Sequence, residues 1–514
     1  MPIGHSLPPP LSLLKIPYNT PMSNGLIELV EHLPQSRILL LGDLMLDRYI
    51  FGNADRLSPE APVPVLHFQH EEYRLGGAGS VLADLSALGA QVSIVAVLGR
   101  DEASKEVRKH LATAGADTSG LLEVDGRPTV TKLRLVGSAQ HRHPQQMIRL
   151  DIEDTGPIDA AIGQKVLDHI KEALDSAHIL CIEDYNKGLI TPQVCKQAIE
   201  LARARKIPVI VDPANIPDYS KYAGATALKL NRSEAERATA LPIRQIEHYA
   251  PAAEFLLKKL NLEAVVITLD KHGAFLATSS GERRHLKTRE RQVFDVTGAG
   301  DMVLAMLTVA RAAGATWTDA VALGNIAGGL EVEKFGCVPI TPQEIIHDLL
   351  SEIRESAGKQ RTADKLVPEL NRHRTLGRKI VFTNGVFDIV HLGHVEYFRF
   401  AKRQGDILVV AVNTDSSVRR LKGPKRPVIP EADRLQLLEE LQSIDYIVSF
   451  DEDTPLKLIE QIKPDVLVKG ADYTKEKVVG WDVVEACGGR IALAPLVDGR
   501  STSSVIQKIL EAYK

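Results

Sequence analysis

The segment Asp295-Val-Thr-Gly-Ala-Gly-Asp301 decides how the first half of this chain folds, because it joins a β-like run to a helical pattern through two glycines. The ten residues that follow, 302–311, have the nearly continuous apolar character of a buried helix. The backbone N–H groups of Gly298, Ala299 and Gly300 would then lie at a helix N-terminus, where they lack partners and the helix dipole favours an anion. The segment therefore predicts an anion hole for a phosphoryl group.

Asp301 would lie beside this anion hole. A carboxylate in that place can accept the proton of an attacking hydroxyl while the backbone stabilises charge on a γ-phosphate. We therefore predict that Asp301 is a general base. The alternative is that Asp295 or Thr297 only caps the helix and that the glycines serve packing. Motifs elsewhere in the chain bear on this choice.

Short β-branched runs alternate with helical patterns in both halves of the chain, which predicts two doubly wound α/β domains with parallel sheets. Two further strand-like runs, 63–68 and 128–135, fall outside this alternation and predict a small side sheet that acts as a lid. The alternating runs are 37–41, 92–97, 178–182, 208–211 and 264–268 in the first half, and 379–382, 406–412, 444–450 and 465–469 in the second.

The length of 514 residues predicts more than one compact domain. Residues 1–35 read as a flexible tail, and residues 36–352 as the first domain. Residues 353–378 are strongly charged with a poorly defined apolar face, so we interpret them as a linker with a connecting helix. A second, smaller α/β domain then occupies residues 379–514.

Composition argues against several kinds of partner. The net charge of −4 gives no field that would attract nucleic acid or an anionic membrane, and no run approaches the roughly 18 apolar residues of a membrane helix. The four cysteines, Cys181, Cys195, Cys337 and Cys487, are widely spaced, which indicates free thiols in a reducing compartment. We expect a cytoplasmic protein that binds neither nucleic acid nor membrane.

The 295–301 segment resembles the C-terminal signature of the ribokinase-like sugar kinases, and four other motifs resemble that family in the same order: 42–48, 75–79, 184–188 and 231–234. Taken alone, Asn231 could be a turn residue and Glu234 part of a solvated helix face. Because they occur together with the other motifs, we interpret them as part of a kinase site. The resemblance implies ATP as cosubstrate, with Mg²⁺ carried by the ATP phosphates and Glu234 and Asp184 as its candidate ligands. It implies sugar binding by Asp43, Asp47, Gly76, Gly77 and Arg149, and ATP or phosphate binding by Asn231, Arg232, Ser233, Glu234, Gly298, Ala299, Gly300 and Lys187.

The second domain opens with the stretch 383–394, Thr-Asn-Gly-Val-Phe-Asp-Ile-Val-His-Leu-Gly-His, in which a strand delivers glycine and two histidines to a helix start. Spaced at i and i+3, His391 and His394 would share one face beside the positive end of the helix dipole, where they can stabilise an α-phosphate under attack. A zinc site would need a third ligand that nothing nearby supplies convincingly. A purely structural histidine pair is the other alternative.

This stretch is similar to the His-x-Gly-His signature of the cytidylyltransferase-like superfamily, whose members join a nucleoside monophosphate to a phosphorylated acceptor and release pyrophosphate. The basic run 419–426 would be read alone as a solvated loop, but it resembles a counterpart in that superfamily. The resemblance implies that His391 and His394 are catalytic. It implies nucleotide contacts from Thr383, Asn384, Gly385, Phe387, Asp388, Asp415, Lys422, Arg434, Lys469, Asp472, Ser501, Thr502 and Ser503.

The two domains in this order resemble the bifunctional heptose enzymes of lipopolysaccharide precursor synthesis, across residues 36–514. The resemblance implies ATP-dependent phosphorylation of D-glycero-β-D-manno-heptose 7-phosphate at O1, and later adenylyl transfer from ATP to heptose 1-phosphate, giving ADP-heptose and pyrophosphate. A separate phosphatase would act between the steps. We also expect a homodimer formed through the kinase domain.

Two residues depart from that family in the kinase half. Ser80 stands where an asparagine is common, and Ala214 stands where a lysine is usual. Loss of a lysine would weaken the grip on a sugar phosphate, although Arg142, Arg149 or Lys187 could compensate. Two alternatives therefore stay open: a kinase and transferase acting on another sugar or polyol phosphate, and a non-catalytic kinase-like scaffold joined to an active transferase.

Overall fold

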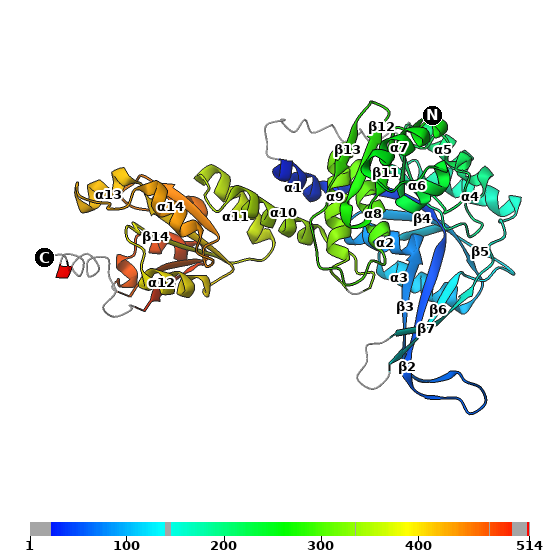
Figure 1. Ribbon diagram of the computed structural model, residues 1–514, viewed down its shortest axis with the longest axis horizontal. Coiled ribbons are helices and arrows are strands. Elements are labelled where there is room, and N and C mark those ends of the chain that lie inside the picture. Colours follow the sequence, from blue (N-terminus) through cyan, green and yellow to red (C-terminus); the bar gives the residue numbers. More distant parts are fainter. Residues whose placement is uncertain (1–21, 139–144, 335, 472, 496–510, 513–514) are drawn as a thin grey trace, which may run out of the picture. The chain divides into compact units, whose positions relative to one another are not determined.

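The computed structural model describes residues 22–138, 145–334, 336–471, 473–495 and 511–512 (Figure 1). The chain divides into two compact units, Met1–Ile346 and His347–Lys514. Among the described residues, no helix combines the length and the apolar character needed to cross a bilayer.

The first unit is built on a nine-stranded sheet in the order β13-β12-β11-β10-β9-β8-β1-β4-β5. Its parallel part confirms the doubly wound prediction, and the last two strands in sequence add an antiparallel edge. The strands are β1 (Arg37–Gly42), β4 (Gln91–Gly99), β5 (Asp117–Val124), β8 (Ile179–Glu183), β9 (Val209–Asp212), β10 (Ala227–Asn231), β11 (Ala264–Thr268), β12 (Ala274–Thr278) and β13 (Arg283–Leu286).

The helices of this unit connect successive strands and bury their apolar sides against the sheet. Residues 22–35, which we had assigned to the flexible tail, form α1 (Met22–His32) and a 3-10 turn, with Ile27, Val30 and Leu33 fully buried. The other helices are α2 (Ala78–Ala87), α3 (Glu102–Thr113), α4 (Ala160–Ala173), α5 (Pro192–Ala204), α6 (Arg232–Thr239), α7 (Tyr249–Leu260), α8 (Ala299–Ala312) and α9 (Trp317–Glu331). Helix α10 (Pro342–Ala357) begins in this unit and continues past its last residue, Ile346.

A four-stranded side sheet extends from this unit, in the order β3-β2-β6-β7 (Figure 1). It consists of β2 (Leu44–Leu57), β3 (Pro64–Gly77), β6 (Thr131–Ser138) and β7 (Gln145–Ile152). The predicted lid sheet is therefore confirmed, and it is larger than the two runs from which it was predicted.

Strand β1 is the point where the winding of the main sheet changes direction, because β4 pairs on one side of it and β8 on the other. Ligands of open α/β sheets bind at such a point, beside the carboxyl ends of the strands. Asp43, Asp184 and Asn231 lie at or just beyond the carboxyl ends of β1, β8 and β10, and Asp212 ends β9. The topology therefore places these four residues side by side at the carboxyl ends of the parallel strands.

The second unit contains a five-stranded parallel sheet in the order β16-β15-β14-β17-β18. Its strands are β14 (Ile380–Gly385), β15 (Ile407–Asn413), β16 (Tyr446–Phe450), β17 (Val466–Gly470) and β18 (Arg490–Ala494). Its helices are α11 (Ala363–Thr375), α12 (Leu392–Lys402), α13 (Asp415–Lys422), α14 (Glu431–Glu439), α15 (Leu456–Ile462) and α16 (Trp481–Ala486). Strand β14 is the central strand of this sheet, and the winding changes direction there because β15 pairs on one side of it and β17 on the other. Helix α12 follows β14 in the chain.

Helix α11 falls inside the range 353–378 that the sequence indicated as a linker. Its Leu366 and Leu370 are fully buried in the same cluster as Phe382 and Tyr446 of the second sheet. The helix is thus an integral layer of the second unit. Its few buried positions are diluted by charged residues, which is why the apolar face was hard to recognise.

We predict that Leu370→Ala lowers the free energy of unfolding of the second unit by about 2–5 kcal/mol, because the truncation leaves a cavity in that cluster. The chain has two tryptophans, Trp317 in the first unit and Trp481 in the second. In a Trp317→Phe background, denaturant unfolding followed by Trp481 fluorescence reports the second unit alone. The control is Leu437→Ala, whose side chain is 46% exposed and should change stability by less than about 0.5 kcal/mol. Equal effects of both variants would contradict the packing of α11.

Candidate active sites

The residues predicted to form the anion hole lie at the N-terminus of α8. Gly298 is the N-cap, with φ of 94°, and an added Cβ would lie 2.7 Å from Oε1 of Glu331 and 3.0 Å from Sγ of Cys337. Both the backbone angle and the space therefore require glycine. The helix begins at Ala299, so the first N–H groups of α8 have no partners within the helix.

Asp301 lies in the first turn of α8, beside those N–H groups. The hydroxyl of Tyr185 donates to its Oδ1 at 3.3 Å, and Ser80 also hydrogen-bonds to the carboxylate. Burial raises the pKa of Asp301 to about 6, while the charge of Lys229 opposes the rise. The carboxylate is thus largely ionised at neutral pH yet basic enough to accept a proton, as a general base must be.

Asp43, predicted to bind sugar, joins two loops. Its Oδ2 accepts hydrogen bonds from the backbone N–H groups of Tyr185 at 3.0 Å and Lys187 at 3.1 Å. Burial raises the pKa of Asp43 to about 6, and the neighbouring charge of Asp184 adds to the rise. Gly77 must approach this loop closely, because its φ is 57° and an added Cβ would lie 2.5 Å from the Asp43 carbonyl oxygen. Asp43 therefore positions the strand-end loops in this structure.

Asp184, one of two predicted Mg²⁺ ligands, is fully enclosed by protein groups. Its Oδ2 accepts from the hydroxyl of Tyr222 at 2.7 Å and pairs with Nζ of Lys221 at 2.5 Å, and its Oδ1 accepts from the N–H of Asn186 at 2.8 Å. These contacts occupy both carboxylate oxygens. The geometry therefore does not support Asp184 as a metal ligand.

The predicted nucleotide motif forms the start of α6. Asn231 is the N-cap: its Oδ1 accepts from the N–H of Glu234 at 3.0 Å, and Oε2 of Glu234 accepts from the N–H of Asn231 at 2.7 Å. Ser233 donates to the same Oδ1, and Arg232 pairs with Asp270 at 3.1 Å. The motif is thus a capping box that fixes a helix N-terminus at the site edge. Burial raises the pKa of Glu234 above its ordinary range.

The charged residues predicted to bind the sugar or a phosphate group already have protein partners. Asp47 pairs with Arg134 at 2.7 Å, and Lys187 pairs with Glu153 at 2.7 Å. Arg149 lies on β7, is 51% exposed, and pairs with Asp151 at 2.9 Å. Gly76 lies against Asp47, since an added Cβ would be 3.0 Å from its Oδ2. Arg142 lies outside the described residues.

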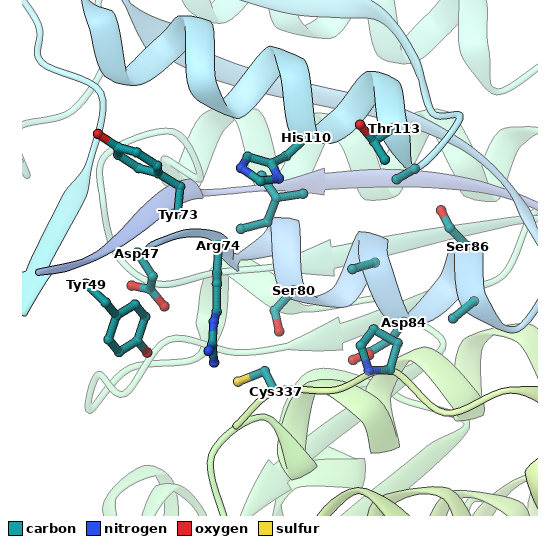
Figure 2. Close-up of a pocket in the computed structure, with 15 residues that line it drawn as sticks. Asp47, Tyr49, Tyr73, Arg74, Ser80, Asp84, Ser86, His110, Thr113 and Cys337 are labelled. Carbon is teal, nitrogen blue, oxygen red and sulfur yellow. The ribbon is translucent and has the colours of Figure 1, made fainter. Parts of the chain in front are cut away.

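A pocket of about 490 Å³ opens between α2, α3 and the base of the lid (Figure 2). Ser80 belongs to its lining and also hydrogen-bonds to Asp301, so it connects the pocket with the predicted general base. Figure 2 shows the side chains of Arg74 and Ser80 pointing toward Cys337. Sequence reasoning predicted Asp47 and missed Arg74, Asp84 and His110, which also line the pocket. No sequence motif marks these three residues.

In the second unit, His391 is the N-cap of α12, as its spacing predicted. Its Nδ1 accepts from the N–H of Gly393 at 3.1 Å, and Nδ1 of His394 lies 3.4 Å from the N–H of His391. The two ring centroids are 4.0 Å apart. Burial, together with the neighbouring His391, lowers the pKa of His394 to about 4. Both histidines therefore lie on one face at the helix N-terminus, with Nδ1 of each facing a backbone N–H.

Asp388 and Arg434, both predicted to contact nucleotide, brace the loops around that helix. Asp388 pairs with Arg426 and accepts from the backbone N–H groups of Val428 at 2.7 Å and Ile429 at 2.9 Å. The guanidinium of Arg434 is completely buried and donates to carbonyls of three different segments. Those acceptors are Val386 at 2.6 Å, Asn413 at 2.9 Å and Ile429 at 3.1 Å, and the carboxylate of Asp415 accepts at 2.8 Å. These hydrogen bonds and ion pairs fix the positions of the loops around the N-terminus of α12.

Strands β14 and β17 carry three more predicted residues, Thr383, Asn384 and Lys469. Thr383 is fully buried and hydrogen-bonds to Tyr397 at 2.6 Å and to the Val468 carbonyl at 3.1 Å, which ties β14 to α12 and β17. Lys469 donates to the Asn384 carbonyl at 3.0 Å, whereas the buried Oδ1 of Asn384 accepts no hydrogen bond from any described residue. That orphaned acceptor at the carboxyl end of a central strand is a site for a ligand donor.

The remaining predicted nucleotide contacts fall into three groups. Gly385 lies under the ring of Phe387, since an added Cβ would be 2.8 Å from it. Lys422 is exposed at the end of α13. Asp472, Ser501, Thr502 and Ser503 lie outside the described residues. Within the described part of the chain, no group of three or more His, Cys, Asp or Glu side chains is arranged to hold a metal ion.

Comparison with known proteins gives a family for each unit. The pfkB family carbohydrate kinase matches residues 35–344, and the cytidylyltransferase-like family matches residues 382–496. Whole-chain relatives include the bifunctional protein HldE of Geobacter metallireducens, 47% identical over 94% of this chain and 98% of the relative. The bifunctional protein HldE of Geobacter sulfurreducens is 44% identical with the same coverage of both chains.

Solved structures resemble the first unit. Arabidopsis thaliana ribokinase, complexed with ribose and ATP, has a TM-score of 0.50 at 19% identity and covers 61% of this chain and 98% of its own. Phosphofructokinase-2 from Escherichia coli, in complex with potassium, has a TM-score of 0.52 at 19% identity and covers 61% of this chain and 99% of its own. At this identity the likeness establishes the ribokinase-like fold alone.

We predict that His394 stays neutral down to about pH 5 because its burial disfavours the imidazolium form. Histidine labelled with ¹⁵N would show its protonation state in long-range ¹H–¹⁵N spectra, with His394→Gln used to assign the signal. The expected midpoint is about 4, with the proton of the neutral ring on Nε2. A midpoint near the ordinary value of about 6.5 would contradict the burial.

Proposed function

We propose roles for individual residues in the two reactions of this chain. The chain belongs to the family of the bifunctional HldE proteins, and it joins a pfkB carbohydrate kinase to a cytidylyltransferase-like domain. The chain is a heptose 7-phosphate kinase and heptose 1-phosphate adenylyltransferase of ADP-heptose synthesis, the route to lipopolysaccharide precursors. The observation that carries the proposal is that each unit presents a helix N-terminus with a suitable catalytic side chain: Asp301 on α8, and the His391–His394 pair on α12.

In the kinase reaction, the carboxylate of Asp301 accepts the proton of the anomeric hydroxyl of heptose 7-phosphate. The resulting O1 nucleophile attacks the γ-phosphorus of ATP, and ADP leaves. The N–H groups of Gly298, Ala299 and Gly300 stabilise the charge on the transferring phosphoryl group. The pocket beside Ser80 holds the sugar, which places O1 next to Asp301.

Mg²⁺ would enter this site with ATP and neutralise charge on its β- and γ-phosphates. Glu234 fits a supporting role, since it is held at the start of α6 and its carboxylate lies within electrostatic reach of the Asp212–Lys229 pair. Asp184 does not fit, because Lys221 and Tyr222 occupy it.

In the adenylyl transfer, a phosphate oxygen of heptose 1-phosphate attacks the α-phosphorus of ATP, and pyrophosphate leaves. Because Nδ1 of each histidine faces a backbone N–H, the neutral rings of His391 and His394 carry their proton on Nε2. Each ring can then donate a hydrogen bond to a phosphoryl oxygen, together with the N-terminus of α12. Oδ1 of Asn384 offers an acceptor for a hydroxyl or amino group of the substrate.

The two reactions should separate by mutation within one chain. Asp301→Asn is expected to reduce kinase kcat by at least about 100-fold, because the general base is lost, and to leave pyrophosphate release from ATP and heptose 1-phosphate unchanged. His394→Ala is expected to do the reverse, with a loss of about 100-fold or more. The measurement is product analysis by mass spectrometry with ATP or CTP and a panel of sugar phosphates. Failure of the parent chain to phosphorylate heptose 7-phosphate would refute the substrate, and an unchanged rate in Asp301→Asn would refute the base.

We also propose that the chain works in the cytoplasm as a homodimer formed through the lid of the kinase unit. Ile148, Leu150 and Ile152 alternate along β7, so their side chains share one face of the lid, and they are 57%, 54% and 45% exposed. A row of exposed apolar side chains on one sheet face is suited to pack against a second copy.

For the dimer, we expect the parent chain to elute in size-exclusion chromatography with light scattering at twice its chain mass of 56.2 kDa. Ile148→Asp combined with Leu150→Asp should shift it to the single-chain mass, because charges would be buried in the interface. Leu456→Asp, an exposed position in the second unit, is the control and should stay dimeric. A parent chain of monomeric mass would contradict the proposal.

A further inference from the structure

We propose that Lys229 is a catalytic residue of the kinase step, whose ammonium group binds the transferring phosphoryl oxygens beside Gly300. This inference rests on the proposed kinase function and adds a residue to it. No motif in the sequence included Lys229, which lies between Leu228 and Leu230 in β10.

Lys229 reaches the anion hole from the neighbouring strand. Its side chain is only 6% exposed, and its Nζ forms a short ion pair with Asp212 at the end of β9. A Cβ added to Gly300 would lie 3.2 Å from Nζ. The ammonium group is therefore next to the backbone that cradles the phosphoryl group, and the absence of a side chain at position 300 keeps that approach open.

The surrounding charges keep this lysine protonated. Burial alone would favour its neutral form, but Asp212 and Glu183 raise its pKa above the ordinary lysine value, and Asp301 contributes. Among the described residues, Asp212 accepts the one hydrogen bond that the ammonium group donates. Because an ammonium group has three donors, others remain for phosphoryl oxygens.

The alternative is that Lys229 only neutralises the buried carboxylate of Asp212. An isolated buried carboxylate is strongly unfavourable, so removing Lys229 alone would affect folding under either explanation. Removing both charges separates the two explanations. In an Asp212→Asn background there is no carboxylate at position 212 for Lys229 to neutralise. The transferring phosphoryl group would still need the positive charge of Lys229.

The test therefore compares the kinase kinetics of the full-length parent, Asp212→Asn, and Asp212→Asn with Lys229→Met, using ATP and heptose 7-phosphate. We expect Lys229→Met to lower kcat by at least about 100-fold in the Asp212→Asn background, with little change in the KM for ATP and in melting temperature. The adenylyltransferase rate of the same chains is the internal control and should not change. Lys229→Arg, which keeps the charge, should retain more activity than Lys229→Met.

A second readout is the acid limb of the kcat–pH profile. The charge of Lys229 holds the pKa of Asp301 down, so removing it should move this limb to higher pH in the Lys229→Met variant. The inference is overturned if Lys229→Met changes kcat by less than about threefold in the Asp212→Asn background. Absence of kinase activity in the parent would instead refute the proposed function, so the two failures are distinguishable.

Discussion

The kinase unit depends on one backbone constraint, the left-handed conformation of Gly298 at the start of α8. Glu331 and Cys337 fill the space where any side chain would lie, so the chain can turn into the helix only at a glycine. That turn leaves the first N–H groups of α8 directed away from the helix and places Asp301 in its first turn. The same few residues thus position both the proposed anion hole and the proposed base.

The sequence indicated the doubly wound architecture, the lid and most of the parallel strands, because buried β-branched runs are a strong local signal. It missed β5, β10 and β18 and the antiparallel edge strands. Strand β10 contains Lys229, whose charge interrupts the apolar run, and its burial depends on Asp212 of a neighbouring strand, which local patterns do not report. Helix α11 was missed as part of the second unit for a related reason, since only a few of its positions enter the core.

The motif residues of each unit lie together in the structure, but the motifs did not indicate which side chains bind neighbouring loops instead of pointing into open space. Asp43, Asp184, Asp388 and Arg434 lie where their motifs placed them, yet their side chains bind backbone groups or buried partners of adjacent loops. A motif records that a residue type is needed at a position. It does not record the direction of the side chain, which is set by loops from distant parts of the chain. The pocket residues Arg74 and His110 come from such distant segments.

The two sites solve the same electrostatic problem in opposite ways. At the N-terminus of α12, the transferase site combines the helix dipole with His394, whose pKa is lowered to about 4, so this histidine adds no charge there at neutral pH. The kinase site instead gathers buried carboxylates: Asp84 and Glu331 have oxygens without hydrogen-bond partners, and burial raises the pKa of Glu331 to about 8. Lys229 is one cation among these acids. Glu331 is therefore largely protonated at neutral pH, whereas Asp301 is largely ionised. Mg²⁺ that enters with ATP would offset the negative charge that remains beside the phosphates.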